Sequence, residues 1–94
     1  MAMEGAYRLG TTQLVSFTST SAANTTAFKA GTNVVRVVAT KGCHVTFSAD
    51  PTAVAASHPY LPAGIVEYYI VSPGEKVAAI RTTTSGNLYV TEVS

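Results

Sequence analysis

Short runs rich in β-branched and aromatic residues, some of which alternate apolar with polar positions, predict a series of short β-strands along the chain. Such alternation places successive side chains on opposite faces of a pleated strand. The segments with this pattern are rich in β-branched and aromatic residues and cover residues 13–18, 33–40, 43–48, 64–71, 76–81 and 87–94. We therefore predict an all-β fold, a single antiparallel β-sandwich or barrel of about six to eight short strands with no significant helix.

The clearest turn signal in the chain is Ser72-Pro-Gly-Glu75. Pro73 presets φ near −65°, and Gly74 supplies the positive φ that the third position of a type II turn requires. Because strand patterns lie on both sides of this turn, residues 64–81 are predicted to form a β-hairpin.

A second hairpin is predicted for residues 33–48. Gly42 lies between its two strands and is expected to take a positive φ in a tight turn. In the second of these strands, Cys43, Val45 and Phe47 alternate with polar residues and are predicted to face inward. Both faces of the first strand carry valines, so both are expected to meet protein.

The strand at residues 64–71 carries large apolar side chains on both faces. We expect the face with Val66, Tyr68 and Ile70 to pack the core. The opposite face then needs cover from a second sheet, from residues 19–32 or from another subunit. One of Tyr68 and Tyr69 is therefore predicted to lie in the core and the other at or near a contact between chains.

The chain is predicted to form one domain with two parts. Residues 1–32 supply N-terminal strands and a Ser/Thr-rich arm, and residues 33–94 form the β-sandwich core. Residues 19–26 are small, polar and uncharged. They are interpreted either as a surface loop or as an extended arm or edge strand that rests on a neighbouring subunit. A brief strand is expected at residues 27–30.

The composition is unusually poor in charge. Charged residues make up 12% of the chain and hydrophobic residues 47%, whereas a typical globular chain has about 25% charged residues. A neutral surface predicts that much of it faces other protein, in a homo-oligomer or a larger assembly. The alternative is an exposed surface rich in Ser and Thr hydroxyls.

Several partner classes do not fit the charge pattern. The net charge is +1, and the six Lys and Arg residues are scattered singly, so no nucleic-acid site is predicted. No basic amphipathic helix and no apolar run of about 20 residues occurs, so no membrane partner is predicted. The N-terminus lacks the apolar segment of a signal peptide, and Cys43 has no second cysteine to pair with. We therefore expect folding in a reducing cytoplasm.

No constellation of catalytic or metal-binding residues is found. There is no Gly-x-Ser-x-Gly motif, and Cys43 and His44 point to opposite faces of a strand. The residues that could bind a metal are Cys43, His44, Asp50, His58 and Glu67, but no two of them have the spacing of a known metal-binding motif. We predict no enzyme activity, no metal, no cofactor and no small-molecule substrate.

Glu67 is a carboxylate within an apolar strand, so it requires solvent or a partner. It is interpreted as lying at an edge or outer face in water. The alternative is an ion pair with Arg36 or Arg81.

Large amphipathic side chains suggest which residues form a protein–protein interface. Tyrosine is enriched in protein interfaces because it offers wide apolar contact and a hydroxyl group. The alternative is that tyrosines stack on sugar rings, as in a carbohydrate-binding module. The predicted interface residues are Thr25, Phe28, Tyr60, Leu61, Tyr68 and Tyr69.

Residues 33–94 resemble small β-proteins of tailed bacteriophages and prophages. The resemblance is carried by Asn33–Ser48 with its Cys-x-Val strand, Asp50–Ala53, Leu61–Gly64, Ser72–Arg81 and the strand that begins at Gly86. It implies a structural virion protein, most of all a capsid decoration (cement) protein that binds and stabilises the assembled head. The alternatives are a head–tail connector, a tail or fibre component, or a carbohydrate-binding module of a host-recognition device.

The same resemblance implies where the protein acts and with what. The expected partners are further copies of the chain, with a trimer as one expected form, and other virion proteins such as the major capsid protein. The expected location is the virion, after synthesis in the host cytoplasm. The resemblance identifies no functional residue.

Overall fold

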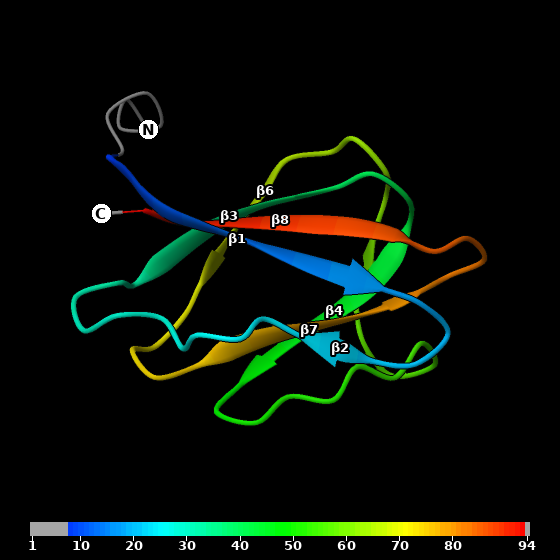
Figure 1. Ribbon diagram of the computed structural model, residues 1–94, viewed down its shortest axis with the longest axis horizontal. Helices are drawn as coiled ribbons and strands as arrows, with labels where there is room; N and C mark the ends of the chain where they lie inside the picture. Colours follow the sequence, from blue (N-terminus) through cyan, green and yellow to red (C-terminus); the bar gives the residue numbers. More distant parts are fainter. Residues whose placement is uncertain (1–7, 94) are drawn as a thin grey trace.

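The computed structural model describes residues 8–93 and shows eight strands in two antiparallel four-stranded sheets (Figure 1). The first sheet has the order β1-β8-β3-β6, with β1 Leu9–Phe17, β8 Gly86–Val93, β3 Val34–Ala39 and β6 Glu67–Ile70. The second has the order β2-β7-β4-β5, with β2 Ala22–Ala23, β7 Lys76–Arg81, β4 Cys43–Ser48 and β5 Tyr60–Leu61.

The all-β prediction is confirmed. The described residues form two facing antiparallel sheets and no helix, which is a sandwich-like arrangement. Residues 8–93 contain no helix that is long and apolar enough to cross a membrane.

The core lies between the two sheets and is built from the inward residues of both. On β4 the predicted inward positions Cys43, Val45 and Phe47 are confirmed, although Phe47 is only partly buried. The buried cluster consists of Val15, Phe17, Phe28, Val35, Val37, Ala39, Cys43, Val45, Leu61, Val71, Val77, Ala79, Leu88 and Val90. At about 25 cal/mol per Å² of buried apolar surface, this cluster is the main source of stability.

Both predicted hairpins are wrong. Strands β3 and β4 lie in different sheets, as do β6 and β7, so each of these turns crosses the core instead of joining paired strands. The turn at residues 72–75 is present, with Glu75 N donating to Ser72 O over 3.1 Å and Gly74 at φ 89°. Hairpins favour the mirror-image turns, because ordinary type I and II turns splay the flanking strands.

Gly42 does not have the predicted positive φ, but it lies directly beneath the Tyr60 ring. The glycines with positive φ in the described chain are Gly31, Gly64 and Gly74. A Cβ on Gly42 would lie 2.8 Å from the Tyr60 hydroxyl oxygen. The absence of a side chain therefore allows Tyr60 to approach the backbone closely.

The two faces of β6 are the reverse of the prediction. Tyr69 pairs with Val35 in the register of β6 against β3, so it follows Val35 toward the core and packs beside Phe47, with ring centroids 5.0 Å apart. Tyr68 is exposed and Ile70 is 88% exposed. The expectation that one of the two tyrosines contributes to the core is met by Tyr69.

The arm that precedes β3 packs on its own chain. Strand β2 pairs with β7 and forms one edge of the second sheet. Residues 27–30 form no strand, although Phe28 is in the core. The arm is held by Asn24, whose backbone N–H donates to Val77 O over 3.1 Å.

Part of the outer face of the β2-β7-β4-β5 sheet is covered by the chain itself. Residues 49–59 run below this sheet in Figure 1, with Pro51 and Ala53 buried. Ala53 N donates to Ser21 Oγ over 2.8 Å, which ties this segment to the arm. Ala78, whose side chain points away from the core on β7, is 0% exposed as a result of such packing.

Candidate protein-binding face

The opposite outer surface, on the β1-β8-β3-β6 sheet, has a regular pattern of three rows across the strands. We define the outer face by these rows, read from the strand register. The first row is Leu9, Val93, Val34 and Ile70, the second is Thr12, Thr91, Arg36 and Tyr68, and the third is Leu14, Tyr89 and Val38. Neighbours in a row share one side of the sheet.

The outer face is largely apolar and open. Among residues 8–93, most of the large hydrophobic side chains that are exposed lie on it or, as Ile65 and Val66, directly before β6. Those on the face are Leu9, Leu14, Tyr68, Ile70 and Tyr89. Exposed apolar side chains gathered on one face of a soluble protein point to an interaction surface.

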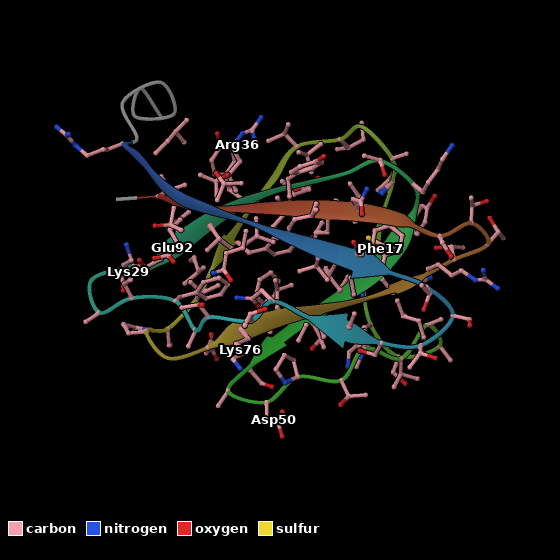
Figure 2. The ribbon with its side chains drawn as sticks, viewed as in Figure 1. Phe17, Lys29, Arg36, Asp50, Lys76 and Glu92 are labelled. Atoms are coloured by element: carbon pink, nitrogen blue, oxygen red, sulfur yellow. The ribbon has the colours of Figure 1, made fainter. Side chains whose placement is uncertain are left out.

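The middle row supplies the polar groups of the outer face. The hydroxyls of Thr12 and Thr91 are hydrogen-bonded over 2.9 Å. Arg36 is half-buried and is the only charged side chain in the three rows. Figure 2 shows Arg36 on the upper side of the sandwich and Asp50 on the lower side. The face therefore combines two apolar rows with one polar row of weak positive charge.

The predicted interface residues are spread over the molecule. Tyr68 lies on the outer face, and Tyr60 is exposed on β5, 5.5 Å from the His44 ring. Thr25 is exposed after β2. Tyr69 is half-buried, and Phe28 and Leu61 are core residues with 2% and 1% exposure, so their side chains are engaged in intramolecular packing.

The two histidines converge, but through a local hydrogen-bonded loop. His44 Nδ1 lies 2.9 Å from the backbone oxygen of His58, and Val54 N donates to His58 Nδ1 over 2.8 Å. The Nδ1 atom of His58 is thereby occupied as an acceptor. Within residues 8–93, no group of three His, Cys, Asp or Glu side chains is placed to hold a metal ion.

Glu67 is exposed on the edge strand β6, opposite Val37. This agrees with the interpretation that it lies at an edge in water. Its row faces the core side of the sheet, and inward-pointing charges on edge strands discourage pairing with other strands. Glu67 therefore favours contacts through the outer face over contacts through the β6 edge.

The buried thiol of Cys43 carries a testable consequence. Burial raises its pKa from the ordinary 9.0 to about 11, and its side chain is 0% exposed. Because the thiolate is the reactive form, we expect no alkylation by iodoacetamide at mildly alkaline pH until urea unfolds the protein. Rapid alkylation of the native protein would contradict this expectation.

The same pKa predicts a loss of stability in alkali. A raised folded-state pKa stabilises the protein below the ordinary pKa, and this contribution is lost as pH rises through about 11. Burial, and then the negative charges of Glu67 and Cys43, also raise the pKa of Tyr69, which adds to the same trend. In urea unfolding, the free energy of unfolding should fall less steeply between pH 9.0 and about 11 for Cys43→Ala than for the wild-type protein.

Glu92 is a buried carboxylate that the sequence interpretation missed. It alternates with Leu88 and Val90 on β8, and this spacing already places it on the core side. Its Oε1 accepts hydrogen bonds from Lys29 N over 3.2 Å and from Thr32 Oγ1 over 2.6 Å. Figure 2 shows Glu92 beside Lys29 at one end of the sandwich.

A shallow cleft of about 340 Å³ opens beside Glu92. It lies where β1 bulges, since Gly10 and Thr11 together oppose Glu92. Lys29 Nζ donates to Thr11 Oγ1 over 3.0 Å and bridges the cleft from the loop to β1. These contacts hold the loop of residues 29–32 against the sheet, which is a structural role for Glu92.

Taken together, the described residues present one extended apolar face, one buried carboxylate bound by its own loop and one inert thiol. This arrangement is suited to binding a protein surface. Comparisons with protein-family models, with curated proteins and with solved structures found no match for this chain.

Proposed function

We propose that this protein is a structural virion protein, a capsid decoration protein of a tailed bacteriophage, and that it binds the assembled head through its outer face. One observation carries the proposal. Residues 49–59 cover part of the outer surface of one sheet, whereas on the other sheet Leu14 and Tyr89 are exposed side by side on β1 and β8, and Tyr68 and Ile70 are exposed on β6. A small domain with few charges gains solubility and stability when such a face is covered.

The proposed mechanism is passive. Binding removes apolar side chains from water across a boundary between subunits, at about 25 cal/mol per Å². A protein that binds only the assembled particle stabilises that particle by mass action. No reacting group is needed for this, and Arg36 with the threonine hydroxyls supplies hydrogen bonds that orient the contact.

Sedimentation with phage heads tests the proposal. Wild-type protein at micromolar concentration is expected to sediment with heads that lack it, and Leu14→Glu is expected to weaken this binding about tenfold or more because it places a charge in the apolar face. Val54→Glu changes a similarly exposed side chain outside the outer face and serves as the matched control.

Isolated tails form the second arm of this experiment. Binding to tails instead of heads would move the protein to the tail or connector and leave the role of the outer face intact. Binding to neither particle would contradict the structural virion role.

A further inference from the structure

We propose that β1 pairs edge to edge with β1 of a second copy, in an antiparallel two-fold dimer. The inference does not depend on the proposed function, because it concerns the hydrogen-bonding edge of a sheet and not its outer face. The observation behind it is that β1 is a long edge strand whose outward backbone groups have no partner among residues 8–93.

Strand β1 differs from the other edge strands of the described chain. The edges of the two sheets are β1 with nine residues, β6 with four, and β2 and β5 with two each. Proteins protect sheet edges from unwanted pairing by making them short or by placing charges on them. Strands β2 and β5 are short, and β6 is short and carries Glu67, whereas β1 contains no charged residue and no proline. Its regular stretch, residues 12–17, is therefore the edge left open for another strand.

The direction of the backbone groups on β1 follows from those on β8. Thr40 N donates to Asn87 O over 2.9 Å, and Asn87 N donates to Thr40 Oγ1 over 3.0 Å, so both backbone groups of Asn87 point to the β3 side. Successive residues of a strand direct these groups to opposite sides. Leu88 therefore points to β1, and its partner Val15 directs its own groups to β8.

By the same alternation, Thr12, Leu14 and Ser16 direct their backbone N–H and C=O groups to the free edge. All three residues are exposed, and no other segment of residues 8–93 supplies a backbone partner to them. The arm leaves these groups unpaired, because it is bound by the side chain of Gln13, whose Oε1 accepts from Thr26 N over 3.1 Å. The free edge thus presents three donors and three acceptors that an extended backbone satisfies.

A second copy of β1 satisfies all of these groups in one register. With a two-fold axis perpendicular to the sheet at Leu14, Leu14 lies opposite the second copy's Leu14, and Thr12 lies opposite the second copy's Ser16. Each opposed pair exchanges two hydrogen bonds. One Leu14 pair and two pairs of Thr12 with Ser16 make three pairs, and hence six bonds. Any other register leaves at least one of these three residues without a partner from the same set.

The side chains of β1 allow the strand to face its own copy. Like charges opposite one another destabilise strand pairs, and residues 9–17 carry no charge. At the axis the two Leu14 side chains, each 53% exposed in the single chain, lie side by side and remove apolar surface from water. Thr12 and Ser16 flank this contact, so hydroxyl groups lie beside hydroxyl groups.

The dimer joins the two four-stranded sheets into one continuous sheet. Because the axis is perpendicular to the sheet, the outer faces of both copies point to the same side. A contact one strand wide is smaller than a standard interface, which buries about 800 Å² per partner, and small contacts are typical of weak, reversible association. We therefore expect monomer and dimer to exchange at concentrations between about 10 µM and 1 mM.

Sedimentation velocity and amide hydrogen exchange across this range test the inference with the whole chain. Wild-type protein is expected to pass from monomer to dimer, and exchange at the amides of Thr12, Leu14 and Ser16 should slow as the concentration rises. A chain that stays monomeric throughout this range would overturn the inference. So would a dimer in which these three amides exchange as fast as in the monomer.

Proline at position 16 removes a donor from the free edge without removing a bond to β8. Ser16→Pro deletes two of the six bonds, one from each copy, so it is expected to weaken dimerisation about tenfold or more. Ser16→Ala loses the same hydroxyl, which donates to Asn87 Oδ1 over 2.9 Å, but keeps the backbone N–H. It should therefore dimerise more tightly than Ser16→Pro. Circular dichroism and thermal unfolding verify that both variants fold, and equal dimerisation of the two would contradict the pairing.

Charges at position 14 test where the axis lies, and this exposed position tolerates them in the folded chain. Leu14→Lys and Leu14→Glu each place like charges opposite one another, so each is expected to weaken dimerisation about tenfold or more. An equimolar mixture pairs the introduced lysine with the introduced glutamate and should dimerise more tightly than either variant alone. A mixture that associates no more tightly than the single variants would overturn the two-fold register at Leu14.

The outcomes separate this inference from the proposed function. Ser16→Pro leaves the apolar side chains of the outer face in place. A monomeric wild-type protein that still binds phage heads would overturn the dimer and leave the virion role standing. A dimer that Ser16→Pro weakens, but that has no affinity for heads or tails, would support the inference and contradict the virion role.

Discussion

Replacing Asn24 with alanine is expected to lower the free energy of unfolding by about 3 kcal/mol, because one buried and two partly buried hydrogen bonds are lost together. Asn24 is 3% exposed, and its Oδ1 accepts a hydrogen bond from Val77 N over 2.7 Å. Its Nδ2 donates to Thr26 O over 2.6 Å and to Gln13 Oε1 over 3.2 Å. Alanine leaves the Val77 amide without its acceptor and releases the arm from β1 and β7.

Urea unfolding followed by circular dichroism measures this effect. Asn24→Asp keeps an acceptor for Val77 N but loses the two donated bonds, so its loss should be smaller than that of Asn24→Ala. Thr25→Ala changes the exposed neighbour and should stay within about 0.5 kcal/mol of the wild type. If Asn24→Ala were as stable as Thr25→Ala, the arm would not depend on this side chain.

The strand pattern predicts the elements of this fold better than their connections. On β4 the apolar positions alternate with polar ones, so the inward residues Cys43 and Val45 are predicted correctly. The partner of a strand depends on whether its turn folds back or crosses the core. A short turn, whether Pro-Gly at residues 73–74 or a single glycine at Gly42, satisfies local geometry in either case, and for that reason both hairpin predictions are wrong.

The faces of β6 show a second limit of the pattern. Tyr68 and Ile70 are as apolar as Tyr69 and Val71, so alternation alone does not say which pair faces the core. The register with β3 decides it, because Tyr69 lies beside Val35 and Tyr68 beside Arg36. Register is a long-range property that is specified weakly when both faces of a strand are apolar.

The candidate face was only partly predictable. Tyr68 is predicted to be an interface residue because tyrosine favours interfaces. Leu14 and Tyr89 belong to the outer face because β1 and β8 pair there. The sequence pattern places Leu14 on the opposite face of its strand from Val15, and Tyr89 on the opposite face from Leu88 and Val90. That these strands are neighbours in one sheet is not visible in the sequence, because residues far apart in the chain form the pairing.

Glu92→Ala is expected to cost about 3 kcal/mol of the free energy of unfolding, because it leaves the Lys29 amide and the Thr32 hydroxyl without an acceptor. Glu92 is 5% exposed, and both donors belong to the loop that joins the arm to β3. The loop should open locally as well, so hydrogen exchange at the Lys29 amide should be faster in the variant.

Two variants separate the contribution of Glu92 as a hydrogen-bond acceptor from the contribution of its negative charge. Glu92→Gln keeps a carbonyl oxygen that accepts from Lys29 N and Thr32 Oγ1, so it should lose less stability than Glu92→Ala. Glu67→Ala removes a carboxylate that is exposed at the sheet edge and should stay within about 0.5 kcal/mol of the wild type. Equal losses for Glu92→Ala and Glu67→Ala in urea unfolding would contradict the role of Glu92 as the acceptor that fixes this loop. A loss in Glu92→Gln as large as in Glu92→Ala would assign the stabilisation to the negative charge instead of the hydrogen bonds.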